Sequence, residues 1–236
     1  MAAVLKSGAA MWRDTDATPR FNIYRIIHKG MRGFMMDTLV RVGRMDVTDD
    51  CERAQTIEQL RGLLAFCAGH LHHENTVVHP AIEKYEPGHS SRTASEHVAH
   101  LVAISALEQQ ALQFETAPAE RLAALAQELY LDLSNFVAEN FEHMAVEETE
   151  NQASLTRGYG DAELLSMEHV IRASLTPEEA RVGLRWMLPH VTAAERAVML
   201  GGMKRGAPPE VFNGVMALAA EVLSQRDLYK LQKALS

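Results

Sequence analysis

Apolar residues recur every three or four positions along most of the chain, which is the period of an amphipathic α-helix. Strand-like alternation never persists, and β-branched residues are scattered. The pattern predicts four long helices, at about residues 21–45, 48–85, 93–114 and 118–155. Turn residues at 86–88 and 158–160 are predicted to end the second and the fourth of them. We therefore expect an all-α fold, with an up-down-up-down four-helix bundle over residues 21–157 preceded by an extension at residues 1–20.

Residues 158–236 change in character and predict a C-terminal module of shorter helices. Two capping boxes, Thr176 with Glu179 and Thr192 with Glu195, are predicted to start two of these helices. Ser224 is a weaker N-cap candidate, and a proline pair at 208–209 separates the middle elements. The module shows no cluster of reactive side chains, and the sequence leaves its role open: contact with a protein partner or with a second copy of the chain is one possible role.

Composition narrows the class of protein. With 236 residues, 47% of them hydrophobic, the chain has enough apolar side chains for a sizeable core without disulfide or metal staples. Only Cys51 and Cys67 are present, without a CxxC motif, which is typical of a reducing compartment. The net charge of −8 argues against nucleic acid or an anionic membrane as the main partner. Neither a secretory h-region nor a run of 18 apolar residues occurs, so we expect a cytoplasmic protein.

The spacing of the histidines is the feature of this sequence that indicates a functional site. His70 is followed four residues later by Glu74, and His143 is followed four residues later by Glu147. Positions i and i+4 lie on one helix face, so each pair presents an imidazole and a carboxylate to the same point. A further histidine precedes each pair at a matched distance, His28 by 42 residues and His100 by 43. The chain thus reads as two similar helical hairpins that aim their ligands at one centre in the bundle.

These residue types suit a pair of metal ions. Imidazole binds iron, zinc and copper, and a carboxylate can bridge two ions. Glu74 and Glu147, one from each hairpin, are the candidate bridges. An ionised glutamate on an inward face of a bundle is costly unless it is paired or bound to metal, which favours the same interpretation.

With these motifs in view, residues 20–155 resemble the hemerythrin family in its bacterial HHE cation-binding form. The matching motifs are IIHKGMR with His28, HLHHENTVVHP with His70 and Glu74, EHVAH with His97 and His100, and HMAVEE with His143 and Glu147. The resemblance implies that His97, His100 and His143 hold one iron and that His28 and His70 hold the other, with both glutamates bridging. The less coordinated iron would then bind O2. Two spacings differ from those of the oxygen carriers, namely HxxH for HxxxH in the third helix and HxxxE for a longer motif ending in aspartate in the fourth, which implies a changed geometry at one iron.

The other polar residues have simpler interpretations. His73, next to Glu74, is an alternative ligand that would replace or join His97, whereas the remaining histidines are expected at the surface: His72, His79, His89, His169 and His190. Cys67 is expected to be a small buried apolar group. Tyr24, one turn before His28, either contacts a bound ligand or places its hydroxyl at the end of the bundle. Pro80 is predicted to kink the second helix.

The leading functional hypothesis is a di-iron protein that binds or senses O2, NO or iron without catalysing a reaction. An O2-activating di-iron oxidase or ferroxidase is the first alternative, although ferritin-like sites use Glu-x-x-His motifs that these helices lack. Iron handling or repair of iron–sulfur clusters is the second. Zinc is an alternative occupant, since imidazole and carboxylate both accept it.

Overall fold

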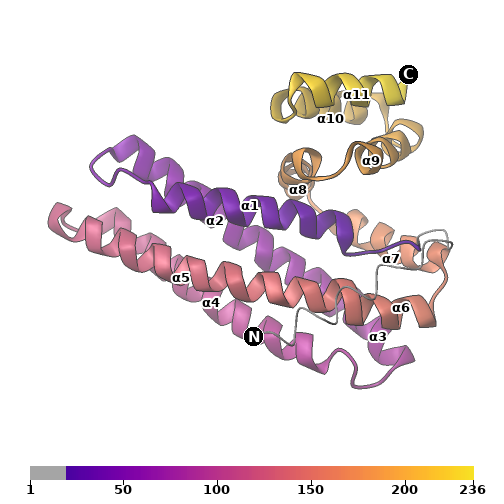
Figure 1. Ribbon diagram of the computed structural model, residues 1–236, viewed down its shortest axis with the longest axis horizontal. Helices are drawn as coiled ribbons and strands as arrows, with labels where there is room; N and C mark the ends of the chain where they lie inside the picture. Colours follow the sequence, from indigo (N-terminus) through magenta and orange to yellow (C-terminus); the bar gives the residue numbers. More distant parts are fainter. Residues whose placement is uncertain (1–19) are drawn as a thin grey trace, which may run out of the picture.

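The computed structural model describes residues 20–236, and the all-α prediction is confirmed for them, because every regular element in this range is a helix (Figure 1). The predicted N-terminal extension lies outside the described residues except for Arg20. No helix in the described part of the chain is long and apolar enough to cross a membrane.

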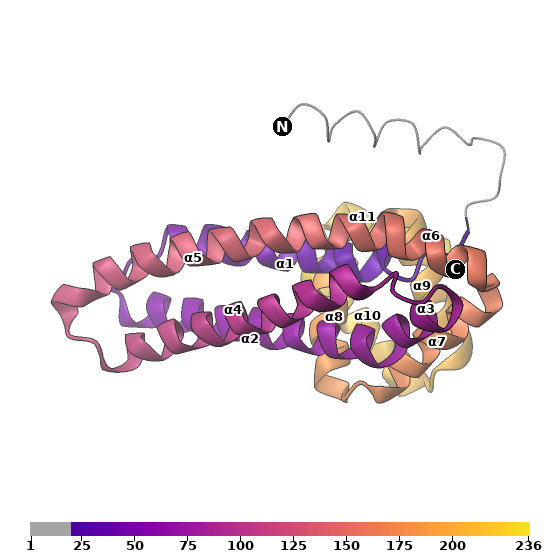
Figure 2. The ribbon, with the colours of Figure 1, turned by 90° about the horizontal axis from the view of Figure 1, so that it is seen from below.

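Four long helices lie side by side, as both ribbon views show (Figures 1 and 2). They are α1 (Arg25–Gly43), α2 (Asp50–His73), α4 (Ser91–Thr116) and α5 (Ala119–Val146). Helices α2 and α5 each contact both α1 and α4, so the four enclose one core of leucine, phenylalanine and methionine side chains. Asp49 caps α2 as predicted, since its carboxylate accepts hydrogen bonds from the backbone N–H groups of Cys51 and Glu52.

The second and fourth long segments are each interrupted by one π-helical turn, where a continuous helix was predicted. Helix α2 passes through η2 (Glu74–Val78) into α3 (His79–Tyr85), and α5 passes through η3 (Glu147–Asn151) into α6 (Gln152–Gly158). Pro80 follows η2 at the start of α3, but η3 has no proline near it, so proline is not the shared cause. The shared feature is a buried glutamate as the first residue of each turn. Single π turns of this kind are frequent at functional sites.

The C-terminal module consists of five short helices. They are α7 (Asp161–Ser174), α8 (Pro177–His190), α9 (Ala193–Gly206), α10 (Pro209–Val222) and α11 (Gln225–Leu235), and their first residues are spaced 16 apart. The hydroxyls of Thr176, Thr192 and Ser224 accept backbone hydrogen bonds at the helix starts, which confirms these predicted caps. Leucine and methionine side chains of α8–α11 form a core that is separate from that of the bundle.

Helix α8 docks the module onto α1 (Figure 1). Gly30 of α1 makes this close approach possible, because a Cβ there would lie 2.9 Å from Met187 Cγ. Phe34 and Trp186 stack across the contact with ring centroids 4.1 Å apart. Lys29 Nζ donates to Glu195 at 2.8 Å. The module therefore covers the helix that carries His28.

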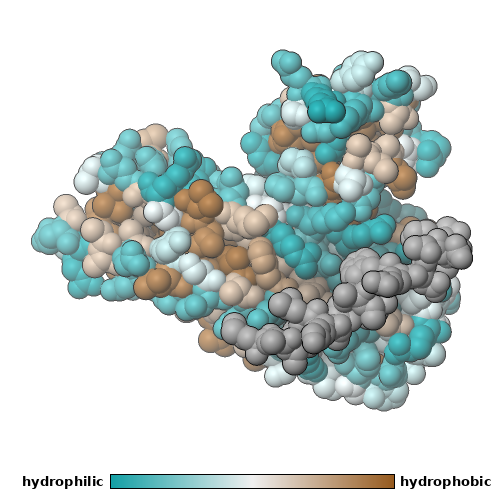
Figure 3. Space-filling view, viewed as in Figure 1, coloured by the Kyte–Doolittle hydropathy of each residue, from teal (hydrophilic) through white to brown (hydrophobic). Residues whose placement is uncertain are grey.

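A small apolar cluster closes the end of the bundle that lies beyond the two π turns. It contains Tyr24, Val78, Ile82, Leu155 and Leu164. Leu164 comes from α7, so the first module helix serves this end of the bundle rather than the core of the module. On the face shown in Figure 3, apolar residues gather over the part of the bundle that the module leaves uncovered.

Candidate metal centre

Six of the predicted ligands meet inside the bundle, where they form two groups of four residues that share both glutamates. The first group is His28, His70, Glu74 and Glu147, and the second is Glu74, His97, His143 and Glu147. Within each group the ligand atoms all lie within 4.8 Å of one another. Local helix geometry explains why His70 lies next to Glu74 and His143 next to Glu147. In each pair the two residues are four apart, at the point where α2 or α5 passes into its π turn.

The first group surrounds one point with two imidazole nitrogens and two carboxylate oxygens. His28 Nε2 lies 3.2 Å from His70 Nε2, 3.7 Å from Glu74 Oε1 and 3.5 Å from Glu147 Oε2. His70 Nε2 lies 3.0 Å from Glu74 Oε1. A transition-metal ion at about 2.1 Å from its ligands holds neighbouring ligand atoms about 3.0–3.4 Å apart, so these distances fit one ion.

The second group repeats this arrangement with the other oxygen of each carboxylate. His97 Nε2 lies 3.0 Å from His143 Nε2, 3.4 Å from Glu74 Oε2 and 3.5 Å from Glu147 Oε1. His143 Nε2 lies 3.2 Å from Glu147 Oε1. Each glutamate thus offers one oxygen to each group, which is the arrangement of a carboxylate that bridges two ions.

Among the described residues, the two glutamates form ion pairs only with the surrounding histidines. The side chains of Glu74 and Glu147 are 3% and 0% exposed, and none of their four oxygens has a hydrogen-bond partner. Burial alone would raise the pKa of Glu74, but the neighbouring His70 and His28 hold it well below its usual range. Two buried, ionised carboxylates at one point are costly without a cation, so the donor set fits a pair of metal ions.

Residues outside the groups fix the imidazole orientations. His28 Nδ1 donates to Glu148 Oε1 at 3.0 Å, and His143 Nδ1 donates to Glu96 Oε2 at 2.7 Å. Since a carboxylate only accepts, each Nδ1 carries a proton, which leaves Nε2 as the nitrogen that would bind an ion. Arginines support both acids, Arg32 at Glu148 and Arg92 at Glu96.

His97 is held in the same way by the opposite hairpin. Its Nδ1 lies 2.8 Å from Asn75 Oδ1, and Asn75 directly follows Glu74, as Glu148 directly follows Glu147. His97 is therefore the counterpart of His28 in the second half of the centre. The sequence spacings of 42 and 43 residues instead match His28 with His100.

His100, the seventh predicted ligand, belongs to neither group. Its ring is 3% exposed and meets the His143 ring edge-on at a centroid distance of 4.9 Å. Burial and the neighbouring His143 and His97 lower the pKa of His100 to about 4. The ring is thus a neutral neighbour of the second group, and its buried Nδ1 has no hydrogen-bond partner.

His79 was predicted at the surface, and that prediction is wrong. The side chain is buried, its ring stacks on His97 at 4.7 Å, and its Nε2 lies 3.3 Å from Thr93 Oγ1. In a regular helix, nine residues would place His79 opposite His70. The extra residue in the π turn η2 rotates everything after it by about 100° and brings His79 inward.

The remaining predictions concern single side chains. His73 is half-buried and takes part in neither ligand group, and His72, His169 and His190 are exposed as predicted. His89 is half-buried, with its Nε2 3.2 Å from the Glu150 carbonyl oxygen. Cys67 is buried as predicted, and burial raises the pKa of its thiol to about 12. Tyr24 is also buried, beside His28.

Comparisons with known proteins add no relative. The chain matches no family model, no curated protein and no solved structure. The assignment of a function therefore depends on the geometry of the site.

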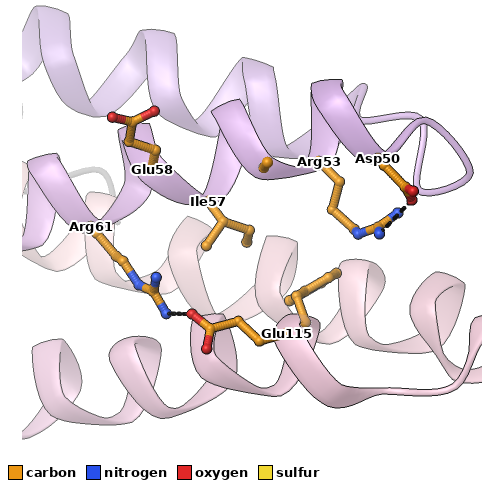
Figure 4. A pocket seen from close by; sticks show the side chains of 8 residues that line it. Asp50, Arg53, Ile57, Glu58, Arg61 and Glu115 are labelled. Carbon is orange, nitrogen blue, oxygen red and sulfur yellow. Dashed lines mark hydrogen bonds and ion pairs between the residues drawn. The ribbon is translucent and has the colours of Figure 1, made fainter.

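A groove of about 370 Å³ lies far from the ligand groups, between the start of α2 and the end of α4 (Figure 4). Four of its five charged side chains pair with one another, Arg61 with Glu115 at 2.6 Å and Arg53 with Asp50 at 2.7 Å, and the fifth is Glu58. The groove leaves no charge of these four for a ligand, so the buried cluster is the stronger candidate site.

Proposed function

We propose that this protein holds a non-haem di-iron centre in a hemerythrin-like up-down-up-down four-helix bundle and binds or senses O2 or another diatomic ligand there. One observation carries the proposal: each of Glu74 and Glu147 directs one oxygen to each of two histidine pairs. Two carboxylates that each direct one oxygen to each histidine pair can bridge two ions, whereas a single ion would need only one of the two histidine pairs.

The choice of iron follows from the donor set together with the resemblance to the hemerythrin family. Each ion would receive two imidazoles and one oxygen from each carboxylate, which suits iron and also zinc. When bound, iron supplies a redox-active position for a small exogenous ligand. His28, His70, His97 and His143 would hold the ions, while Glu148, Glu96 and Asn75 orient three of those imidazoles.

Ligand binding is favoured over substrate oxidation by the balance of donors. Four neutral imidazoles and two carboxylates make a site of lower negative charge than the carboxylate-rich centres that oxidise substrates. The ligand atoms are also buried, and the apolar cluster of Tyr24, Val78, Ile82, Leu155 and Leu164 excludes bulk water from one side. A buried site beside apolar side chains suits a small molecule.

Anaerobic loading tests the proposal. The full chain is loaded with ferrous iron, bound iron is measured after desalting, and the optical spectrum is recorded before and after air is admitted. We expect two ions per chain and a new absorption band after air. Fewer than one ion per chain, or an unchanged spectrum, would refute the proposal.

A matched pair of variants separates the centre from surface histidines. Glu74→Ala should abolish bound iron, whereas His72→Ala, which removes an exposed imidazole two residues away, should keep both ions. Equal loss of iron in the two variants would mean that the metal binds at the surface.

A further inference from the structure

Tyr24 is a buried polar side chain beside the centre whose hydroxyl the fold does not explain. It is 1% exposed, and its hydroxyl has no partner at hydrogen-bond distance, with the Asn151 side chain as its polar neighbour. Leaving a buried hydroxyl unpaired costs about 1–3 kcal/mol. A phenylalanine would fill the same space in the apolar cluster without that cost, so the hydroxyl is a feature that packing does not require.

The ring of Tyr24 lies next to His28, a member of the first ligand group. Tyr24 precedes α1 by one residue and lies one turn before His28, with the two ring centroids 5.3 Å apart. Its ring packs among Val78, Ile82 and Leu155, and burial together with the charges of Glu147 and Glu74 raises the pKa of its hydroxyl. The apolar part of the side chain is thus anchored, and its one donor is left beside the centre.

At the equivalent position of the other hairpin, one turn before His97, the side-chain hydroxyl is hydrogen-bonded. Thr93 lies one turn before His97, as Tyr24 lies one turn before His28. The Thr93 hydroxyl donates to the Ser90 carbonyl and accepts from Asn151 Nδ2 at 3.2 Å. The two halves of the centre therefore differ at this position, because the hydroxyl one turn before His28 is unpaired and the hydroxyl one turn before His97 is paired.

Of the four histidines in the two groups, the one most exposed to solvent also belongs to the His28–His70 group. The side chain of His70 is 10% exposed, whereas those of His28, His97 and His143 are 0%, 1% and 3% exposed. A small molecule that enters the bundle meets the His28–His70 group more readily than the other group.

We propose that the Tyr24 hydroxyl donates a hydrogen bond to the exogenous ligand at the ion held by His28 and His70. The site would then favour small ligands that carry a hydrogen-bond acceptor on an atom away from the metal. This inference rests on the proposed dinuclear centre and adds the class of ligand and the residue that selects it.

Azide is a suitable probe, because it binds ferric iron through one end and accepts hydrogen bonds. The wild-type chain, Tyr24→Phe and Tyr159→Phe are loaded with ferric iron, and azide is titrated optically. Tyr159 is the matched control, since it packs in the same cluster but donates to the Ala81 carbonyl at 2.9 Å. We expect Tyr24→Phe to weaken azide binding about tenfold and Tyr159→Phe to leave it within about twofold.

The infrared stretch of bound azide distinguishes hydrogen bonding from a change in packing. It should shift on transfer to D2O in the wild type and in Tyr159→Phe, but not in Tyr24→Phe. Equal azide affinities and equal D2O shifts in all three proteins, each holding two irons, would overturn the role of Tyr24 and leave the dinuclear centre standing. Loss of an iron from Tyr24→Phe alone would also overturn it, whereas a wild-type chain without two irons would refute the proposed function itself.

Discussion

Glu74 and Glu147 lie 73 residues apart in the sequence, yet each places its two oxygens between the same two pairs of histidines. Glu74 Oε1 is 3.0 Å from His70 Nε2, and its Oε2 is 3.4 Å from His97 Nε2. Glu147 mirrors this contact, with Oε2 3.5 Å from His28 Nε2 and Oε1 3.2 Å from His143 Nε2. The two carboxylates are thus equivalent. Each belongs to both ligand groups, whereas each histidine belongs to only one of them.

Removal of one histidine should affect one ion, and removal of a shared glutamate should affect both. We expect about one ion per chain in His28→Ala and in His97→Ala, because each variant breaks only one of the two groups. Glu147→Ala should hold less than one. Metal analysis by mass spectrometry after desalting measures this, with circular dichroism to verify the helical fold. Two ions retained in Glu147→Ala would contradict the bridging assignment.

The acids behind the imidazoles should tune metal affinity without being ligands. Glu148→Gln and Glu96→Gln each replace a charged partner of an imidazole Nδ1, and such changes typically lower metal affinity about 10- to 100-fold. Glu150→Gln, an exposed side chain in the same π turn as Glu148, is the control and should be neutral. Competition with a chelator gives the affinities. A loss of affinity as large in Glu150→Gln would show that net charge alone is responsible.

The contact between α1 and α8 should be sensitive to one methyl group. In Gly30→Ala the added Cβ would meet the Met187 backbone nitrogen at 3.1 Å as well as its side chain, so the helices must separate. We expect a loss of about 1–3 kcal/mol in the free energy of unfolding, measured by urea denaturation. Gly202→Ala in α9, where no atom lies within 4 Å, should instead gain about 0.5–1 kcal/mol. Equal effects of the two substitutions would argue against close packing at Gly30.

The ion pair between Lys29 and Glu195 should make stability depend on acid pH. Burial alone would raise the pKa of Glu195, but Lys29 and the hydrogen bonds at Thr192 lower it from its ordinary value of 4.5 to about 2. A depressed carboxyl pKa stabilises the fold above the unfolded value, and this contribution is lost as the pH falls from about 4.5 towards 2.

At neutral pH, Glu195→Gln should therefore be less stable than the wild type by about 1 kcal/mol. The difference should disappear near pH 2, and thermal unfolding followed across this range measures it. Glu210→Gln, which alters an exposed acid in the first turn of α10, should show no such dependence. A difference that persists unchanged to pH 2 would contradict the role of the ion pair.

The two thiols should react at very different rates. Cys51 is exposed at the start of α2, whereas Cys67 is 1% exposed and burial raises the pKa of its thiol to about 12. Because the thiolate is the reactive form, a chromogenic disulfide reagent should modify one thiol quickly in the native protein and the second only after denaturation. Cys51→Ser should remove the fast phase. Two fast thiols in the native wild type would contradict the burial of Cys67.

The sequence alone determined the helical class and the two His-x-x-x-Glu pairs, because both follow from contacts within one helix. Positions i and i+4 share a face wherever the helix lies, so His70 with Glu74 and His143 with Glu147 could be paired before any packing was known. The caps at Asp49, Thr176, Thr192 and Ser224 are local in the same sense.

Only the tertiary structure decided which histidine of the third long helix faces the glutamates. His97 and His100 lie three residues apart on one helix face, and the choice between them depends on how far α4 slides along its neighbours, which no local spacing fixes. The π turn η2, which buries His79 against His97, also depends on packing, because a change of backbone hydrogen bonding is stabilised by the side chains that it brings inward. The free hydroxyl of Tyr24 is likewise a property of the assembled bundle, since a missing partner is visible only when every neighbour is in place.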